Sequence, residues 1–224
     1  MADDRPQSSL ADIPAAGLDD LIFRRRSIRK YLSDPLPEAW VEAVLRCAHQ
    51  APSPSNCQPV RFVRIASSEY RNTLRQALVE GHARLIARHK AMAGAARLRN
   101  QINAYRRYAE FMFEAPELLA VGTSTQTQGF STKLFAAGLM EAHHQHACDL
   151  DITVGLALKG MLLKAQSMGV GTCILTAPLV FIDHPEKLLH LERIAIKCFV
   201  CLGFAAESPD PPKRVPLDTV VQVI

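Results

Sequence analysis

The chain has 224 residues, of which 48% are hydrophobic and 21% charged, a balance that predicts one globular domain with a sizeable core. Its formal net charge of +4 is mild, so it suits an anionic ligand without requiring nucleic acid. No apolar run approaches the roughly 20 residues that a membrane-spanning helix needs, so we expect no membrane contact.

The N-terminal residues differ from the rest of the chain. Residues 1–17 are acidic, polar and proline-containing, without the apolar core of a secretion signal. We therefore interpret 1–17 as a flexible extension and 18–224 as a single domain. Six cysteines are scattered along the chain, and five of them lie in or beside apolar segments. That placement indicates reduced thiols and a cytoplasmic location.

The densest charge follows a short amphipathic helix expected over 18–26. Residues 24–30 read Arg-Arg-Arg-Ser-Ile-Arg-Lys, five cations and one hydroxyl in seven positions. If the chain is extended here, Arg25, Ser27 and Arg29 share one side. Guanidinium forks match a phosphate and serine adds a hydroxyl donor, so the stretch can cradle a phosphate. Taken alone, however, it is more typical of a solvated basic helix end.

A clear helix is predicted next, with Pro37 at its first position. Two prolines and three small polar residues then force a loop over 51–56. A strand is expected over 60–65. The apolar stripe that identifies the helix has spacings i, i+3, i+4 and i+7 and consists of Val41, Val44, Leu45 and Ala48.

Residues 68–113 are predicted to form two helices with a break near Gly94. From 81 to 109 there are seven Lys/Arg residues and no acid, which makes this the best nucleic-acid candidate in the chain. Its aromatic residues are confined to Tyr105 and Tyr108, and no known nucleic-acid-binding motif accompanies them. The pattern therefore favours a solvated helix face, and we expect no nucleic acid.

A second strand is expected over 118–123, apolar enough to be central, followed by a polar loop over 124–131. A histidine and cysteine cluster comes after it. No second cluster with zinc-type spacing exists elsewhere in the sequence, so we expect no metal site. A polar helix start or a loop at the mouth of an active site is the preferred interpretation. The cluster comprises His143, His144, His146 and Cys148.

The longest apolar helix is predicted over 151–168, with Gly169 just past its end. It is apolar on nearly every face, which indicates burial in a core or a subunit interface. A glycine-rich turn over 169–178 then feeds a short strand, and its glycines would let the backbone approach a flat ligand.

The last third of the chain predicts a short helix over 183–191, N-capped by Asp183, and a continuously apolar central strand over 194–204. Cys198 and Cys201 lie an odd number of residues apart, so they should point to opposite faces of that strand, which argues against a disulfide or a metal clip. Residues 217–224 look able to add a strand. Because helices and strands alternate, we expect an α/β layered domain.

In four segments the chain resembles the nitroreductase family of flavoproteins: 25–29 with Tyr31, 51–59, 169–173 and 213–217, in the family's order and spacing. The resemblance implies an α+β, three-layer sandwich with a central mixed or antiparallel sheet flanked by helices. It also implies an intertwined homodimer, with a C-terminal strand extending toward the partner subunit, and FMN bound by residues 18–224 at the subunit interface.

The resemblance also assigns roles to residues on the sheet side of the site. Arg25 and Ser27 would hold the FMN phosphate, with Arg214 as a further cation and Arg26 beside them through its backbone. Arg29 would reach the N1/C2 edge of the flavin, where a fixed cation stabilises negative charge on the reduced ring. The C-terminal turn departs from the family's spacing at Lys213, which makes that residue a weaker candidate than Arg214.

Residues on the other sides of the flavin follow in the same way. Pro52, Ser53 and Asn56 would come from the partner subunit and contact the ribityl chain and ring. The family's usual tryptophan is replaced by Val60, and its usual glycine or acid near N5 by Thr176. Asn103 and Tyr108 are the candidates for a polar ring contact from the middle helices. Under the ring, with backbone groups near N5, would lie Leu175, Thr176 and Ala177.

The activity that the resemblance implies is ping-pong electron transfer from NAD(P)H through FMN to an electron-poor aromatic acceptor, such as a nitroaromatic or a quinone. The flavin supplies the chemistry at N5, so no side chain is assigned as a catalytic acid or base. The alternatives are a flavin-cleaving or dehalogenating enzyme on the same scaffold, a flavin-storage protein, and a basic nucleic-acid-binding module.

Overall fold

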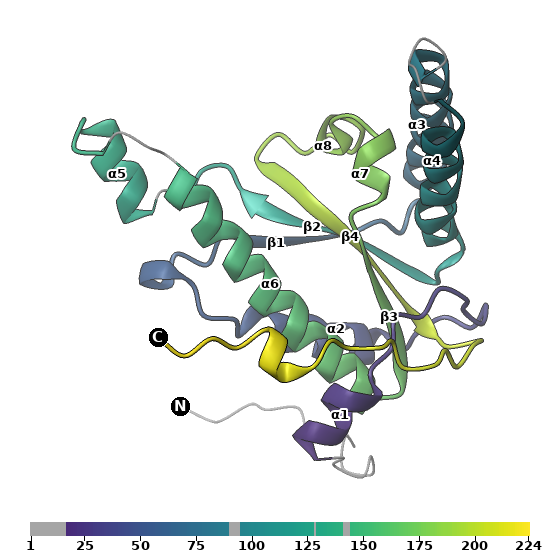
Figure 1. The fold of residues 1–224 in the computed structure, drawn as a ribbon, viewed down its shortest axis with the longest axis horizontal. Helices are drawn as coiled ribbons and strands as arrows, with labels where there is room; N and C mark the ends of the chain where they lie inside the picture. Colours follow the sequence, from purple (N-terminus) through teal and green to yellow (C-terminus); the bar gives the residue numbers. More distant parts are fainter. Residues whose placement is uncertain (1–16, 90–94, 128, 141–143) are drawn as a thin grey trace.

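The computed structural model describes residues 17–89, 95–127, 129–140 and 144–224, and for 89, 95, 132 and 144–147 it describes only the backbone. Figure 1 shows the arrangement of its elements. The strands are β1 (Val60–Arg64), β2 (Glu117–Ser124), β3 (Val170–Leu175) and β4 (Ile194–Phe204). The α-helices are α1 (Leu18–Arg24), α2 (Glu38–His49), α3 (Ser68–His89), α4 (Ala95–Glu110), α5 (Phe130–Ala136), α6 (His144–Ser167), α7 (Pro178–Phe181) and α8 (Pro185–Leu188), and 3-10 helices cover Pro54–Asn56, Phe111–Glu114 and Leu217–Thr219.

The four strands form one antiparallel sheet in the order β1-β2-β4-β3. β2 and β4 are therefore the central strands, as their continuously apolar sequences predict. At the end of α6, Gly169 has a φ of +71°, which confirms its predicted place just past the helix. None of the described helices combines the length and the apolarity that crossing a membrane requires.

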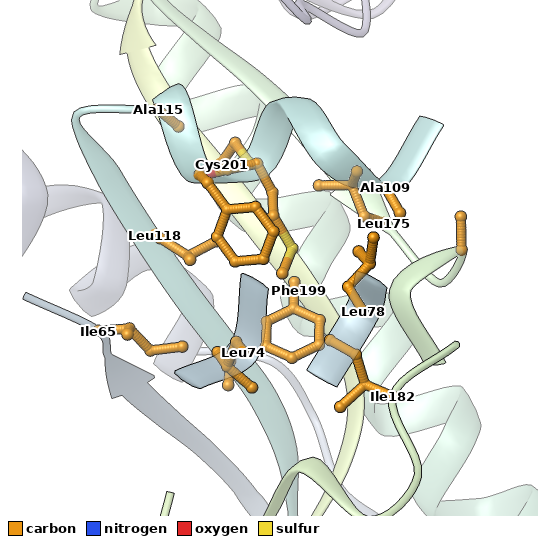
Figure 2. Close-up of a cluster of buried hydrophobic side chains, with 14 of the residues drawn as sticks. Ile65, Leu74, Leu78, Ala109, Ala115, Leu118, Leu175, Ile182, Phe199 and Cys201 are labelled. Atoms are coloured by element: carbon orange, nitrogen blue, oxygen red, sulfur yellow. The ribbon is translucent and has the colours of Figure 1, made fainter. Parts of the chain in front are cut away.

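Helices cover both faces of the sheet, so the domain has three layers. Phe199 and Cys201 of β4 face a cluster that includes residues of α3, α4 and α7, shown in Figure 2. Cys198 and Val200 face the other way, into a cluster with residues of α2 and α6. This alternation confirms that Cys198 and Cys201 lie on opposite faces of the strand. The buried side chains Val41, Val44 and Ala48 form the predicted stripe of α2, while Leu45 is half-buried.

The helices α3 and α4 lie side by side and rise away from the sheet (Figure 1). A ring nitrogen of His82 on α3 is 2.8 Å from Oδ1 of Asn103 on α4. The C-terminal half of α3 packs tightly on α7, because a Cβ placed on Gly81 would lie 1.8 Å from the Phe181 carbonyl oxygen. The two predicted helices are thus confirmed, while the break expected near Gly94 lies outside the described residues.

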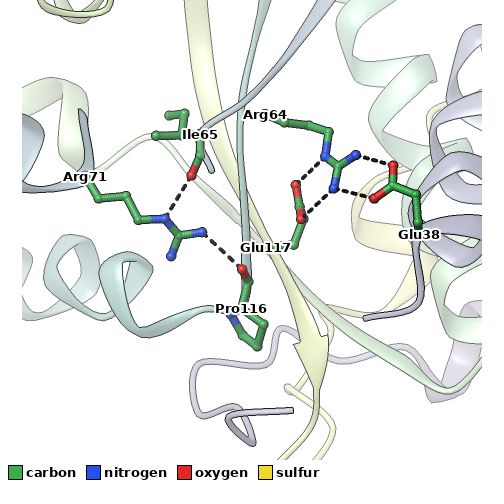
Figure 3. Close-up of polar contacts among 6 residues, drawn as sticks. All are labelled: Glu38, Arg64, Ile65, Arg71, Pro116 and Glu117. Carbon is green, nitrogen blue, oxygen red and sulfur yellow. Dashed lines mark hydrogen bonds and ion pairs between the residues drawn. The ribbon is translucent and has the colours of Figure 1, made fainter. Parts of the chain in front are cut away.

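Two arginines connect helices to the sheet through ion pairs and hydrogen bonds, as Figure 3 shows. Arg64 at the end of β1 pairs with Glu38 of α2 and with Glu117 of β2, at 2.8 Å from the latter. Arg71 of α3 donates to the carbonyl oxygens of Ile65, Ala115 and Pro116 at 2.7–3.1 Å. Because these guanidinium groups are occupied by structural partners, neither of them is a free ligand-binding cation.

Two predictions about local structure were wrong. The helix α8 is preceded by His184 in a left-handed conformation, whereas Asp183 is drawn away from the cap by an ion pair with Arg84 at 2.6 Å. Pro37 lies just outside α2, at its N-cap rather than its first position. Within a single chain, Leu217–Thr219 form a 3-10 helix and residues 217–224 pair with no strand, so the strand expected to extend toward a partner subunit stays a prediction.

Candidate flavin site

The segment that follows α1 is extended along the edge of β3. Ser27 forms a parallel bridge with Thr172, and the amide of Ile28 donates to the Thr172 carbonyl at 2.9 Å. The Tyr31 hydroxyl donates to the Ile28 carbonyl at 2.6 Å, which closes the segment from the other end. Ile28 points into the core, against Gly171. The extended geometry is the one that allows alternate residues of this run to share a side.

Cations gather at this edge of the sheet. The pKa of Arg25 lies below its ordinary value, because the side chain is partly buried and because Arg214 and Arg26 repel its charge. Within the described ranges no carboxylate lies within ion-pair distance of Arg25. The acid that lies beside this segment, Glu207, accepts hydrogen bonds from the backbone amides of Arg29 and Lys30. Like charges held together are stabilised by a bound anion. Arg25, Ser27 and Arg214 remain predicted phosphate ligands, and the structure brings the charges of Arg25 and Arg214 close to each other.

The side chain of Arg26 forms hydrogen bonds with the backbone. Its Nη1 donates to the carbonyl oxygens of Phe23, at 2.6 Å, and of Arg25, at 2.9 Å. These contacts satisfy carbonyl groups that α1 leaves free at its C-terminus. One end of the Arg26 guanidinium is thus held by the backbone, while its charge still acts on Arg25.

A cavity of about 190 Å³, here called the ring pocket, opens beside this segment. Arg29 lines one side, and its Cζ lies 5.9 Å from the ring centroid of Tyr108. Tyr108 in turn packs edge-on against Tyr105, with 6.5 Å between the centroids. The remaining lining residues are Phe111, Cys173, Ile174, Leu175, Thr176 and Ala177. A slot with aromatic walls and a cation at one edge suits a flat ring that gains negative charge.

Cys173 lies at the floor of the ring pocket. Burial raises the pKa of its thiol, opposed by the positive charges of Arg29 and Arg25 and by a contact with Ser27. These contacts show that Arg25, Ser27 and Arg29 surround one point on β3. Cys173, Tyr105 and Phe111 were not predicted as site residues. The spacing of Tyr105 and Tyr108 could have indicated a shared aromatic surface, because residues three apart on a helix lie on the same face.

The loop after α2 lines a different cavity, of about 220 Å³, here called the loop pocket. Ser55, Asn56 and Gln58 all have positive φ, and the Ser53 hydroxyl accepts a hydrogen bond from the Gln58 amide at 2.9 Å. The loop pocket is lined by Pro52, Ser53 and Pro54 and by Asp149, Ile152, Thr153 and Leu156 of α6. Within one chain, Pro52 and Ser53 are thus not brought together with Arg29 and Thr176.

Neither pocket is large enough for a whole cofactor. Ligand sites usually measure about 300–1,000 Å³, and both cavities fall below that range. Beside the loop pocket, Ile152 and Leu156 of α6 are 61% and 45% exposed. The inner face of α6 is buried against the sheet. Within a single chain, the predicted burial of this helix therefore holds for that face only.

Two other expectations concern the surroundings. Asn103 does not line the ring pocket, because its side chain is engaged by His82, whereas Tyr108 does line it. The described part of the chain holds no group of three His, Cys, Asp or Glu side chains that could bind a metal. In the histidine cluster, His143 lies outside the described residues, and the side chains of His144 and His146 are likewise not described.

Residues 22–204 match the model of the Nitroreductase family. The chain is 29% identical over 220 residues to an NADH dehydrogenase of Thermus thermophilus, spanning 94% of this chain and 98% of that protein. Its fold is similar to a BluB-like flavoprotein of Clostridium difficile, with a TM-score of 0.76 and 20% identity over 93% of this chain and 99% of the other. It is also similar to oxidized iodotyrosine deiodinase bound to FMN and 3-iodo-L-tyrosine, with a TM-score of 0.65 and 20% identity over 90% and 96% of the two chains.

Proposed function

Because the chain belongs to the nitroreductase family, we propose that it is an FMN-dependent oxidoreductase that takes electrons from NAD(P)H and delivers them to an electron-poor aromatic acceptor, such as a nitroaromatic or a quinone. The observation that carries this proposal is the convergence of Arg25, Ser27 and Arg214 beside a slot edged by Arg29. The NADH dehydrogenase relative and the FMN-bound structural neighbour support the reductant and the cofactor.

The residues present fit FMN. Guanidinium groups and a hydroxyl suit its phosphate, and an aromatic slot suits its ring. When bound, FMN supplies hydride and electron transfer at N5. Arg29 would stabilise negative charge at the ring edge, while Tyr105, Tyr108 and Phe111 would keep water from one side of the slot. No side-chain acid or base is assigned to the reaction.

The complete site is proposed to form in a homodimer. The ring pocket of one protomer would meet the loop pocket of its partner, which would supply Pro52, Ser53 and Asn56. The exposed Ile152 and Leu156 beside the loop pocket support this arrangement, because apolar side chains gathered on a surface favour a protein partner. Residues 18–224 would act as one FMN-binding domain, and the scattered cysteines support a cytoplasmic location.

The test is the visible absorption spectrum of the purified protein, recorded without oxygen before and after NADH or NADPH is added. Flavin bands near roughly 450 nm that bleach on addition are expected. A colourless protein that takes up no added FMN would contradict the proposal. At residue level, Arg25→Ala and Ser27→Ala should lower the amount of retained FMN, whereas Cys198→Ser, on the far face of β4, should not.

A dehalogenating enzyme, or a flavin-cleaving one, is the second candidate. The similarity to iodotyrosine deiodinase over 90% of the chain supports the first of these. A flavin spectrum that NADH and NADPH fail to bleach, together with loss of halide from a halogenated phenol when dithionite is the reductant, would favour dehalogenation. Oxygen-dependent loss of the flavin spectrum itself would favour flavin cleavage.

A further inference from the structure

One face of α4 runs outward from the ring pocket. Tyr108, Tyr105, Gln101 and Arg97 follow one another at separations of three, four and four residues, the spacing that places side chains in one row on a helix. The two tyrosines line the pocket, and Gln101 and Arg97 are exposed. Arg97 lies eight residues before Tyr105, which is about 12 Å along the helix axis. We call these four residues the α4 row.

The cation at the outer end of the α4 row is not neutralised. Three arginines of the α3–α4 pair have acidic partners: Arg75 pairs with Glu114, Arg84 with Asp183 and Arg106 with Glu110. Arg97 takes part in none of the ion pairs of the described residues, and from 81 to 109 the sequence contains no acid that could balance it. Arg97 is therefore free to attract an anionic group that approaches along α4.

The two ends of the α4 row match a ligand with an aromatic ring at one end and an anionic group at the other. A neutral nitroaromatic or quinone needs only the ring pocket, whereas every nicotinamide dinucleotide carries a pyrophosphate. Nucleic acid would need aromatic residues spread along the cationic face, but Tyr105 and Tyr108 lie together at the pocket. The reductant is thus the ligand whose chemistry fits the whole row.

We propose that Arg97, with Gln101 beside it, binds the phosphate groups of NAD(P)H while the nicotinamide ring stacks on the flavin at the mouth of the ring pocket, on the side of Tyr105 and Tyr108. This inference rests on the proposed function and adds a binding determinant for the reductant. The α4 row determines affinity rather than the electron-transfer step, because Arg97 lies outside the ring pocket. Screening by salt should weaken the contribution of this exposed cation.

The experiment follows flavin reduction by stopped flow, without oxygen, in the FMN-loaded protein with NADH and with NADPH. Arg97→Gln is compared with Arg99→Gln, which removes another exposed charge almost on the opposite side of the same turn. We expect Arg97→Gln to raise the Kd for the dinucleotide about threefold to tenfold and to leave the limiting rate and the FMN content unchanged. Arg99→Gln should change the Kd by less than about twofold.

A third reductant, 1-benzyl-1,4-dihydronicotinamide, carries the ring without any phosphate and should reduce both variants and the wild type alike. A dinucleotide Kd that is unchanged in Arg97→Gln, or an equal loss with the phosphate-free reductant, would overturn the inference and leave the proposed function intact. Salt-dependent binding of a single-stranded oligonucleotide that both variants weaken, with the dinucleotide Kd unchanged, would assign this face to nucleic acid instead. A wild-type flavin that no nicotinamide reduces would contradict the proposed function itself.

Discussion

The two halves of the site differ in how the chain holds them. The sheet wall, which consists of Arg25, Ser27, Arg29 and Thr176, is bridged to β3 and carries converging positive charge. The loop wall, which consists of Pro52, Ser53 and Asn56, is a short turn with left-handed residues beside exposed apolar side chains of α6. One wall is proposed to be complete within a single chain, and the other is proposed to be completed by a second copy. Cofactor binding should therefore depend mainly on the sheet wall and dimer assembly on the surface beside the loop wall. Substitutions in each region can test this separately.

The largest effect is expected from Leu156→Glu on α6. A carboxylate placed in an apolar interface is costly to bury without a partner, so this variant should be monomeric and should lose FMN at the same time. Light scattering coupled to gel filtration, with flavin absorbance recorded on the same peak, measures both properties. Val180→Glu, an equally exposed apolar position on α7, is the control and should stay dimeric and yellow. A dimeric, flavin-loaded Leu156→Glu protein would show that α6 is not the interface.

Ser53→Trp tests the loop wall without touching α6. The indole would fill the loop pocket and remove the hydrogen bond that Ser53 accepts from Gln58. We expect FMN affinity to fall more than about 100-fold while the dimer persists, because only the face toward the cofactor changes. Titration of the apoprotein with FMN, followed by flavin fluorescence, measures the affinity. Unchanged FMN affinity would place the loop wall away from the cofactor.

Arg25→Ala tests the sheet wall. A charged hydrogen bond to a phosphate contributes about 1.5–3 kcal/mol, so the Kd for FMN should rise about 10-fold to 100-fold with no change in assembly. Arg46→Ala is the matched control, because Arg46 pairs with Glu42 on the exposed surface of α2. Equal FMN affinity in the two variants would contradict the assignment of Arg25 to the phosphate.

The smallest effect on the cofactor is expected at Cys198, in the sealed core behind the sheet wall. Burial raises the pKa of its thiol from 9.0 to about 12, so the folded state holds a proton that the unfolded state releases above pH 9. The stability due to Cys198 is therefore fully present below pH 9 and is lost as the pH rises toward 12, by about 2 kcal/mol at about pH 10.5. The free energy of unfolding, measured with urea at both ends of this pH range, should fall less in Cys198→Ala than in the wild type. An identical pH dependence in both proteins would show that the thiol is not sealed from solvent.

The strength of the sequence signal decides how much of the fold could be predicted. The continuous apolar runs of β2 and β4 predict burial on both faces, and therefore a central position in the sheet. The odd spacing of Cys198 and Cys201 predicts that they lie on opposite faces of β4. The helices α5 and α7 are too short to show a helical period, so they were not predicted. Asp183 is a good cap in sequence terms, but a long-range ion pair with Arg84 overrides that preference.

The same limit applies to the site. Alternation along the extended run was enough to place Arg25, Ser27 and Arg29 on one side. Tyr105 of α4 and Phe111 of the following 3-10 helix were missed, because their place in the pocket depends on how the α3–α4 pair packs on the sheet, which local sequence does not encode. Asn103 was a reasonable candidate until its contact with His82 became visible. The strand expected over 217–224 does not form within one chain, because its pairing edge would have to come from elsewhere.

The most direct test of the two-wall account is a mixed dimer in which one protomer carries Arg25→Ala and the other carries Ser53→Trp. Differently tagged chains are co-expressed, and the heterodimer is purified through both tags. If each site takes its sheet wall from one protomer and its loop wall from the other, one site in the heterodimer is intact and the second carries both changes. The account predicts one tightly bound FMN per heterodimer, where either homodimeric variant binds poorly. A heterodimer that binds no better than the two variants would contradict it.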